Sequence, residues 1–335
     1  MILEDWGWST DFAEAFASWN DSDHVPARVI RGEKNYFRVI SPVGELTVRF
    51  TGKIRHHAGG RPDLPVVGDW VVIAPQSQQR GTIVALLERK NSFSRNLPGR
   101  RKGREQRAEE QVIAANIDLV IIVSGLDQDF NLRRIERYLT LVSSSGAAAV
   151  LILNKADLHP DPHACVDEVA SVAGSTPILV CSALEPLQLV PLLPYLKPGQ
   201  TVALLGSSGV GKSTIVNALL GDDRQKIAAV SSADGKGRHT TTHRELFLLP
   251  QGGILMDNPG MRELHLWGES IDLEESFADI LELAQGCRFR DCSHVHEPGC
   301  AVQQAAIKGT LDTDRLANYH KLKTELEALQ KPRPH

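Results

Sequence analysis

Residues 201–217, TVALLGSSGVGKSTIVN, constrain the fold of this chain more than any other stretch. The apolar run at 201–205 predicts a buried strand, residues 206–213 fit the pattern G-x-x-x-x-G-K-[ST], and residues 213–220 have helical periodicity. A strand, a glycine-rich turn and a helix in this order direct backbone N–H groups at a bound phosphate. The stretch therefore predicts a nucleotide phosphate site in an α/β fold.

Each residue type in this loop has a chemical reason to be there. Gly206, Gly209 and Gly211 permit dihedral angles and a close approach that a Cβ would obstruct. The Lys212 ammonium would reach the β and γ oxygens of the nucleotide, and the Ser213 hydroxyl would bind Mg²⁺. The remaining loop residues expected to line the nucleotide are Ser207, Ser208, Val210 and Thr214.

Length and composition bound the rest of the chain. With 335 residues it should form two or three domains, and 42% hydrophobic with 23% charged residues is typical of a soluble globular protein. No apolar run approaches the ~18 residues of a membrane span, and the acidic, aromatic N-terminus is unlike a signal peptide, so we expect a cytoplasmic protein. A formal net charge of −4 means that contact with nucleic acid must come from a local basic patch.

The first 90 residues predict a helix followed by a small barrel. Trp8, Phe12, Phe16 and Trp19 recur at spacings of three and four within residues 1–20, which indicates an amphipathic helix whose aromatics pack on a core. Five short β-like runs follow between residues 25 and 89. Five strands in so short a stretch are typical of an OB-fold barrel, a fold that often binds nucleic acid.

Residues 95–107, RNLPGRRKGREQR, carry five Arg and one Lys against one Glu. Glycine and proline indicate a flexible linker, and a solvated charged loop would account for the composition. In an otherwise acidic chain, beside a predicted OB-fold, the stretch favours contact with the phosphate backbone of RNA.

The middle of the chain alternates strands and helices. Apolar runs at 117–124, 147–153 and 177–180 predict buried parallel strands, and 132–143 predicts a helix between the first two, so we expect a doubly wound parallel sheet. The second strand ends in NKAD at 154–157 and the third in CSA at 181–183, at the sheet edge where such folds bind ligands.

NKAD indicates which base is bound. The Asp157 carboxylate can accept from both N1–H and the 2-amino group of guanine, whereas adenine offers neither donor. Asn154 can bridge neighbouring loops or reach the purine edge, and the Lys155 stem can lie along the base. At the next strand end, beside Ser182, a backbone N–H near Ala183 can donate to guanine O6.

Together these motifs resemble a family. NKAD, SAL at 182–184, the phosphate loop, a threonine run at 240–242 and DNPG at 257–260 are the GTPase signatures in rotated order. The chain resembles the circularly permuted GTPases of the RsgA (YjeQ) family from end to end, most specifically at GRHTTTH and CRFRDCSHVHEPGC. The resemblance implies a GTP hydrolase that binds the 30S ribosomal subunit and 16S rRNA as a switch in late subunit maturation, and we expect a monomer.

The rotated order puts the residues that sense the γ-phosphate last. A hydroxyl from the threonine run would complete the Mg²⁺ shell, and likeness to the family favours Thr241. Asp257, at the end of a strand at 254–256, would hold Mg²⁺ through water, and the Gly260 N–H would contact the γ-phosphate. Asn258 departs from the usual DTPG. Because these residues run directly into the C-terminal domain, nucleotide state can move that domain.

Catalysis departs from the familiar pattern. Many GTPases position the attacking water with a glutamine just after this glycine, but here Met261 follows, and an apolar side chain cannot orient water. His239 is the catalytic candidate, because an imidazole can accept from water and the resemblance places it in the mobile loop. Alternatively, His239 packs or touches rRNA, and Arg238 contacts phosphate.

Three of the five cysteines crowd into 287–300. Cys287, Cys292, His294 and Cys300 form C-x₄-C-x-H-x₅-C, a set suited to one tetrahedral, structural zinc ion. His296 is an alternative nitrogen ligand, and the resemblance favours His294. Cys165 and Cys181 lie elsewhere, as packing residues.

The sequence thus predicts a multidomain α/β protein: a helix and OB-fold barrel (1–94), a basic linker (95–110), a permuted P-loop GTPase domain (111–268) and a helical zinc domain (269–335). Met261 keeps a second function open, a GTP-regulated RNA-binding scaffold with negligible turnover. A third, an ATP-dependent kinase, is disfavoured by Asp157.

Overall fold

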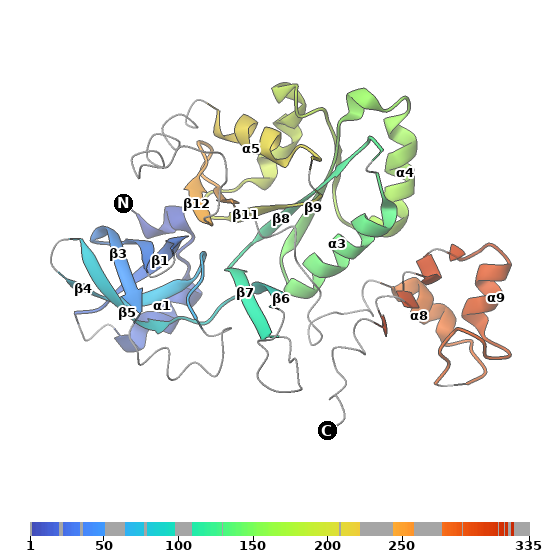
Figure 1. The fold of residues 1–335 in the computed structure, drawn as a ribbon, viewed down its shortest axis with the longest axis horizontal. Helices are drawn as coiled ribbons and strands as arrows, with labels where there is room; N and C mark the ends of the chain where they lie inside the picture. Colours follow the sequence, from blue (N-terminus) through green and yellow to red (C-terminus); the bar gives the residue numbers. More distant parts are fainter. Residues whose placement is uncertain are drawn as a thin grey trace.

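The computed structural model describes residues 2–19, 23–33, 36–50, 64–76, 79–97, 109–128, 130–207, 209–221, 244–257, 277–289, 291–313, 315–317, 319–320 and 323–324. Figure 1 shows a strand-rich N-terminal part, a central sheet flanked by helices, and a small helical part near the C-terminus. None of the described helices has the length and apolar character needed to cross a membrane.

The N-terminal strands close into a barrel, as predicted. Antiparallel pairs join β1 to β2, β2 to β3, β4 to β5 and β1 to β4, and a parallel pair joins β3 to β5, which completes the circle. The side chains alternate, so that Leu46 and Val48 face the core while Thr47 and Arg49 are exposed. The strands are β1 (Val25–Gly32), β2 (Phe37–Ser41), β3 (Gly44–Phe50), β4 (Trp70–Gln76) and β5 (Arg80–Leu86).

The predicted N-terminal helix packs on this barrel through its aromatic side chains. It consists of η1 (Leu3–Trp6), α1 (Thr10–Phe16) and η2 (Ala17–Trp19). Ring centroids of Trp8 and Phe12 lie 4.7 and 5.6 Å from that of Trp70 on β4. Edge contacts of this kind add to the area that the rings bury, so the aromatic spacing reports core packing.

The basic stretch between barrel and sheet begins inside a strand. β6 (Ser92–Leu97) pairs antiparallel with β7 (Glu109–Ala115). The first three residues of the stretch predicted as a linker, 95–97, therefore belong to a strand, and the predicted domain boundaries at 94 and 110 fall within this pair. Residues 98–108, which hold most of the basic side chains, lie outside the described residues.

The central part is the predicted sheet, with strand order β10-β9-β8-β11-β13-β12. All neighbours are parallel except β12, which runs antiparallel to β13 and which the sequence analysis did not predict. The strands are β8 (Leu119–Gly125), β9 (Ala148–Asn154), β10 (Ile178–Val180), β11 (Thr201–Leu205), β12 (Glu245–Leu248) and β13 (Ile254–Asp257), and the helices are α3 (Leu132–Ser145), η4 (Ala156–Leu158), α4 (Pro162–Ala173), η5 (Pro186–Tyr195) and α5 (Lys212–Leu220).

A buried arginine joins the barrel to this sheet. Arg28 on β1 donates to Thr201 Oγ1 at 2.6 Å, to Asn116 O at 3.3 Å and to Trp6 O, and its guanidinium lies 5.5 Å from the Trp70 ring centroid. Burial lowers the pKa of Arg28 to about 10, which leaves it charged at neutral pH. β1 also pairs with β12 at Arg31 and Glu245, so barrel and sheet are continuous.

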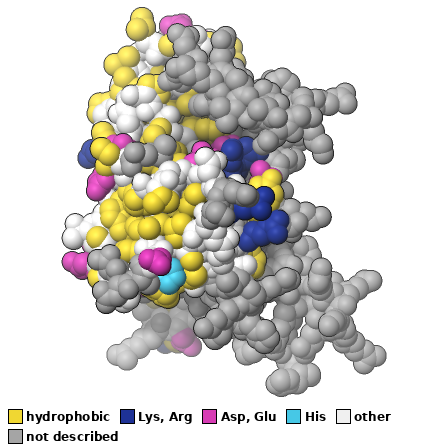
Figure 2. Space-filling view, turned by 90° about the vertical axis from the view of Figure 1, so that its left-hand side faces the viewer, with side chains coloured by type: hydrophobic (Ala, Val, Ile, Leu, Met, Phe, Trp, Pro, Cys, Tyr) yellow, Lys and Arg dark blue, Asp and Glu magenta, His cyan; other side chains and the backbone are white. Residues whose placement is uncertain are grey.

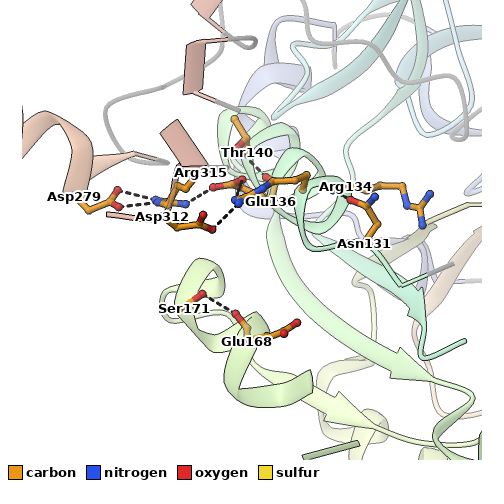
Figure 3. Close-up of polar contacts among 10 residues, drawn as sticks. Asn131, Arg134, Glu136, Thr140, Glu168, Ser171, Asp279, Asp312 and Arg315 are labelled. Carbon is orange, nitrogen blue, oxygen red and sulfur yellow. Dashed lines mark hydrogen bonds and ion pairs between the residues drawn. The ribbon is translucent and has the colours of Figure 1, made fainter. Parts of the chain in front are cut away.

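The C-terminal part is a small cluster with its own core around Phe277, Ile280, Val302 and Tyr319. It contains α8 (Ala278–Ala284) and α9 (Ala301–Ile307), the latter at the predicted position. Figure 3 shows how it meets α3: Arg315 contacts both Asp279 and Glu136, and Asp312 also reaches toward α3. Of the predicted helix at 316–329, only 316–317, 319–320 and 323–324 are described.

Candidate functional site

The phosphate loop connects β11 to α5 at the carboxyl edge of the sheet, as predicted. Gly206, Gly209 and Gly211 all have positive φ. A Cβ on Gly211 would lie 2.2 Å from Asn154 Nδ2, so only glycine allows the loop to approach Asn154 this closely. The Lys212 ammonium folds back over the loop and donates to the carbonyls of Gly206 and Ser207 at 2.6 and 2.5 Å.

Asn154 joins the phosphate loop to the loop after β10. Its Nδ2 donates to Val210 O at 2.8 Å, and its Oδ1 accepts from Ala183 N at 2.8 Å. The side chain is 2% exposed. Of the two roles that the sequence left open for Asn154, the structure shows the bridge between loops. NKAD, CSA and the phosphate loop, far apart in the chain, therefore meet at one place.

The other residues of NKAD surround this bridge. Lys155 adopts a left-handed backbone with φ 64°, and its Nζ lies 2.5 Å from Asp127 Oδ2 in the loop after β8. Asp157 is exposed in η4. The N–H of Ala156 donates to Cys181 O at 3.2 Å, which fixes η4 against the loop that carries Ser182.

Two residues that the sequence analysis did not select also hold this edge. Gln188 on η5 accepts from Ser182 N at 2.7 Å through Oε1. No sequence signal marks Gln188, because the 3₁₀ geometry of η5, which contains Pro191 and Pro194, follows no helical repeat. Asp127 had a signal, since an acidic residue two positions after a buried parallel strand lies at the edge where ligands bind.

The described part of the expected magnesium site comes from neighbouring strands. Ser213 is exposed in the first turn of α5, directly after the β11 loop, and Asp257 ends β13, which pairs with β11. Thr214 follows in the same turn. The remaining selected residues, Ser208, His239, Thr241 and Gly260, lie outside the described residues, as do Arg238, Asn258 and Met261.

The cysteine and histidine cluster is compact. The ligand atoms of Cys287, Cys292, His294 and Cys300 all lie within 4.8 Å of one another. Cys287 Sγ is 3.8 Å from Cys300 Sγ and 3.6 Å from His294 Nδ1, which is 3.4 Å from Cys300 Sγ. Tetrahedral zinc, with bonds of about 2.3 Å to sulfur and 2.0 Å to nitrogen, separates such ligands by about 3.5–3.8 Å. The donor set and its spacing therefore fit zinc.

The residues around this cluster orient it. Cys300 precedes α9 and its Sγ accepts from Gln303 N at 3.4 Å, while Gln303 Nε2 donates to His294 O at 3.2 Å. His296 is exposed, so of the two histidines the cluster takes His294. The other two cysteines, Cys165 and Cys181, are buried within the central part. Burial raises the pKa of the Cys181 thiol to about 11, so it remains neutral.

Comparison with known proteins decides the family. The sequence model of the RsgA GTPase family matches residues 86–267. The chain belongs to this family. The small ribosomal subunit biogenesis GTPase RsgA of Opitutus terrae is 46% identical over 97% of this chain and 90% of its own length. The protein is therefore a GTPase, and the predicted resemblance is confirmed.

Two solved structures resemble this RsgA-family chain along most of its length. The crystal structure of YjeQ from Thermotoga maritima covers 92% of the chain and all of its own, with a TM-score of 0.65 at 28% identity. The crystal structure of YloQ, described as a circularly permuted GTPase, covers 93% of this chain and 97% of its own, with a TM-score of 0.62 at 24% identity. At this identity the likeness supports the fold alone. The predicted fold class, a barrel followed by a permuted GTPase core and a metal-binding cluster, is confirmed.

Proposed function

We propose that this RsgA-family chain binds GTP at the edge formed by the β9, β10 and β11 loops and hydrolyses it as a switch in late maturation of the small ribosomal subunit. The bridge made by Asn154 carries the proposal, because it brings the predicted guanine loop against the predicted phosphate loop. One nucleotide can then contact both. The name of the Opitutus terrae relative supports the role in small-subunit biogenesis.

Each residue has a proposed part in binding. The loop from Gly206 to Thr214 would hold the phosphates through its N–H groups at the start of α5, with Lys212 turning from the loop carbonyls to the β and γ oxygens. Asp157 would select guanine. The ligands proposed for Mg²⁺, which neutralises charge that develops on the phosphates, are Ser213, Thr241 and Asp257.

The base and the hydrolytic water involve different parts of the chain. The N–H groups of Ser182 and Ala183 already donate to Gln188 and Asn154, so a contact with guanine O6 falls to the next N–H along the backbone, that of Leu184. For the water, we propose His239, because Met261 stands where a water-orienting glutamine is usual.

We propose that the barrel provides one contact with 16S rRNA. Arg38 pairs with Thr47 across β2 and β3, and Thr47 pairs with Arg80 across β3 and β5, so these side chains share the outer face. Arg49 lies on the same face, one outward position along β3. Figure 2 shows this side of the molecule, where a small group of Lys and Arg side chains lies next to a larger area of hydrophobic side chains. Basic side chains on strands 2 and 3 suit the face that OB-folds use for oligonucleotides.

The zinc cluster has a structural part in the proposal. Four protein ligands leave no open position for water, so zinc would stabilise the fold around it and supply no chemistry. This fold presents Arg288 over the half-exposed ring of Phe289, 5.5 Å from its centroid. An arginine and an aromatic ring side by side are groups on which bases stack, which makes this loop the second proposed RNA contact.

Turnover with and without purified 30S subunits tests the function. We expect phosphate release to rise when subunits are added. Lys212→Ala should abolish both phosphate release and tight nucleotide binding. GTP-dependent binding to the subunit without phosphate release would instead support the scaffold that Met261 keeps open. If Lys212→Ala leaves nucleotide affinity unchanged, the proposed phosphate site is wrong.

A further inference from the structure

An ion pair joins Lys155 of NKAD, the guanine loop, to Asp127, a residue that belongs to neither this motif nor the phosphate loop. The Lys155 ammonium is 2.5 Å from Asp127 Oδ2, and the two side chains are 27% and 26% exposed. Lys155 starts from the end of β9, whereas Asp127 follows the end of β8, so the lysine side chain runs sideways along the edge of the sheet.

The backbone fixes both ends of this pair. Asp127 O accepts from Phe130 N at 2.9 Å, and Leu126 N donates to Asn154 O at 2.8 Å, which ties the β8 loop to the residue before Lys155. A Cβ on Gly125 would lie 2.8 Å from Asp127 Oδ1 and 3.6 Å from Lys155 Cδ. The pair therefore lies directly over the Gly125 backbone, in space that any larger residue would occupy.

The strand order decides what passes over the pair. β8 lies between β9, which carries Asp157, and β11, which carries the phosphate loop. A nucleotide with its base at the first loop and its phosphates at the second must cross the end of β8. The methylene stem of Lys155, held at its far end by Asp127, lies along this crossing.

We propose that Asp127 is a positioning residue for guanine binding: it holds the Lys155 ammonium so that the lysine stem is already ordered as an apolar surface for the base. The inference rests on the proposed nucleotide site and deepens it. A lysine without this anchor must be ordered at each binding event, and that ordering lowers affinity. Anchoring by Asp127 leaves the hydrogen bonds of Asp157 unchanged.

The test measures GDP and IDP affinities of the full chain, because inosine lacks the 2-amino group that Asp157 would recognise. We expect Asp127→Asn to weaken both nucleotides by the same factor, roughly 3- to 10-fold, the range for immobilising one long side chain. The ratio of the two affinities should stay at its wild-type value. Glu168→Gln, which removes an exposed acid on α4, is the matched control and should change neither affinity.

A double mutant identifies the route through Lys155. Lys155→Met keeps an apolar stem but removes the charge that Asp127 holds, so Asp127→Asn should have no further effect in that background. Additive losses would overturn the inference, and so would a changed GDP to IDP ratio, because Asp127 would then act through Asp157. Failure of the site itself looks different: Asp157→Asn would leave the ratio unchanged and Lys212→Ala would leave affinity unchanged.

Discussion

Replacing Arg315 with methionine should loosen the C-terminal part of the chain from α3. Arg315 makes two hydrogen bonds of 2.7 Å with Asp279 and contacts Glu136 Oε1, and its guanidinium lies 4.9 Å from the Phe277 ring centroid (Figure 3). Side-chain exposure separates the two acids, since that of Glu136 is 2% and that of Asp279 is 46%. The two contacts should therefore differ in energy.

The loss of stability depends on how deeply buried the charged group is that each substitution leaves behind. Without Arg315, the buried Glu136 loses the partner of its Oε1, while Arg133 Nη1 stays 3.6 Å from its Oε2, and breaking a buried ion pair from one side costs about 3–5 kcal/mol. Asp279→Asn removes a half-exposed partner, for which about 0.2–1 kcal/mol is usual. Methionine keeps much of the packing on Phe277, so the loss of stability in Arg315→Met measures mainly the loss of the arginine charge.

Calorimetry of the full, metal-loaded chain measures both costs. For a chain of 335 residues, about 3–5 kcal/mol lowers the midpoint of unfolding by roughly 4–7 °C, against about 1.5 °C or less for Asp279→Asn. Combining Arg315→Met with Glu136→Leu should recover most of the loss, because apolar residues can replace a buried ion pair at little cost. Equal effects of the two single substitutions, or no recovery in the double mutant, would refute the reasoning.

The pKa of Asp279 determines how the difference in stability between wild type and Asp279→Asn varies with pH. Burial alone would raise the pKa of Asp279, but the hydrogen bonds and charge of Arg315 outweigh it and hold that pKa below its usual value. A carboxyl whose pKa is lowered by folding stabilises the protein above its unfolded pKa, about 3.9, and this contribution disappears as the pH falls through the native value. The difference between wild type and Asp279→Asn should therefore be constant above about pH 5 and vanish in stronger acid.

Three further outcomes are expected. Gly211→Ala should weaken GDP binding about 10- to 100-fold in a fluorescence titration, because its Cβ would overlap Asn154 and the strained backbone costs about 1–3 kcal/mol; affinity within twofold of wild type would contradict this. Arg28→Met should lower stability by about 3 kcal/mol in thermal unfolding, since it leaves Thr201 and two buried carbonyls without a donor. Chelation should release about one zinc per chain and unfold the C-terminal part by circular dichroism, while GDP affinity persists.

Local pattern was enough to predict most of the fold. The runs that became β1 to β5, β8, β9 and β11 are apolar or alternating, and the phosphate loop is marked by glycines whose φ values are all positive. The metal cluster could also be predicted from the sequence, because its four ligands lie within fourteen residues and zinc binds those atom types. β12 was missed because its short run, ELFL, stands alone between polar segments.

Contacts between residues far apart in the chain could not be predicted from the sequence. Arg28 and Thr201 are 173 positions apart, and Glu136 and Arg315 are 179 apart. From sequence alone, an arginine on a strand and a glutamate on a helix are both predicted to be exposed to solvent. Only the partner across the fold shows that they are buried. Asn154 was intermediate: its motif selected it, but only the folded chain shows that its amide joins two loops.

The two connections between domains differ in the kinds of contact that form them. The barrel meets the sheet through a fully buried arginine, anchored at the first residue of β11, and through strand pairing at β12, and such contacts break only with large loss of stability. The C-terminal part meets α3 through one half-exposed ion pair, between Asp312 and Arg133, and one buried ion pair, between Arg315 and Glu136. Water can replace the partner of Asp312 at little cost, whereas separating Arg315 from the buried Glu136 costs about 3–5 kcal/mol. If nucleotide state moves the C-terminal part, as the rotated motif order predicts, the pair between Asp312 and Arg133 separates at least cost, and the pair between Arg315 and Glu136 is the contact that resists the motion. The barrel would then stay fixed to the strand that carries the phosphate loop.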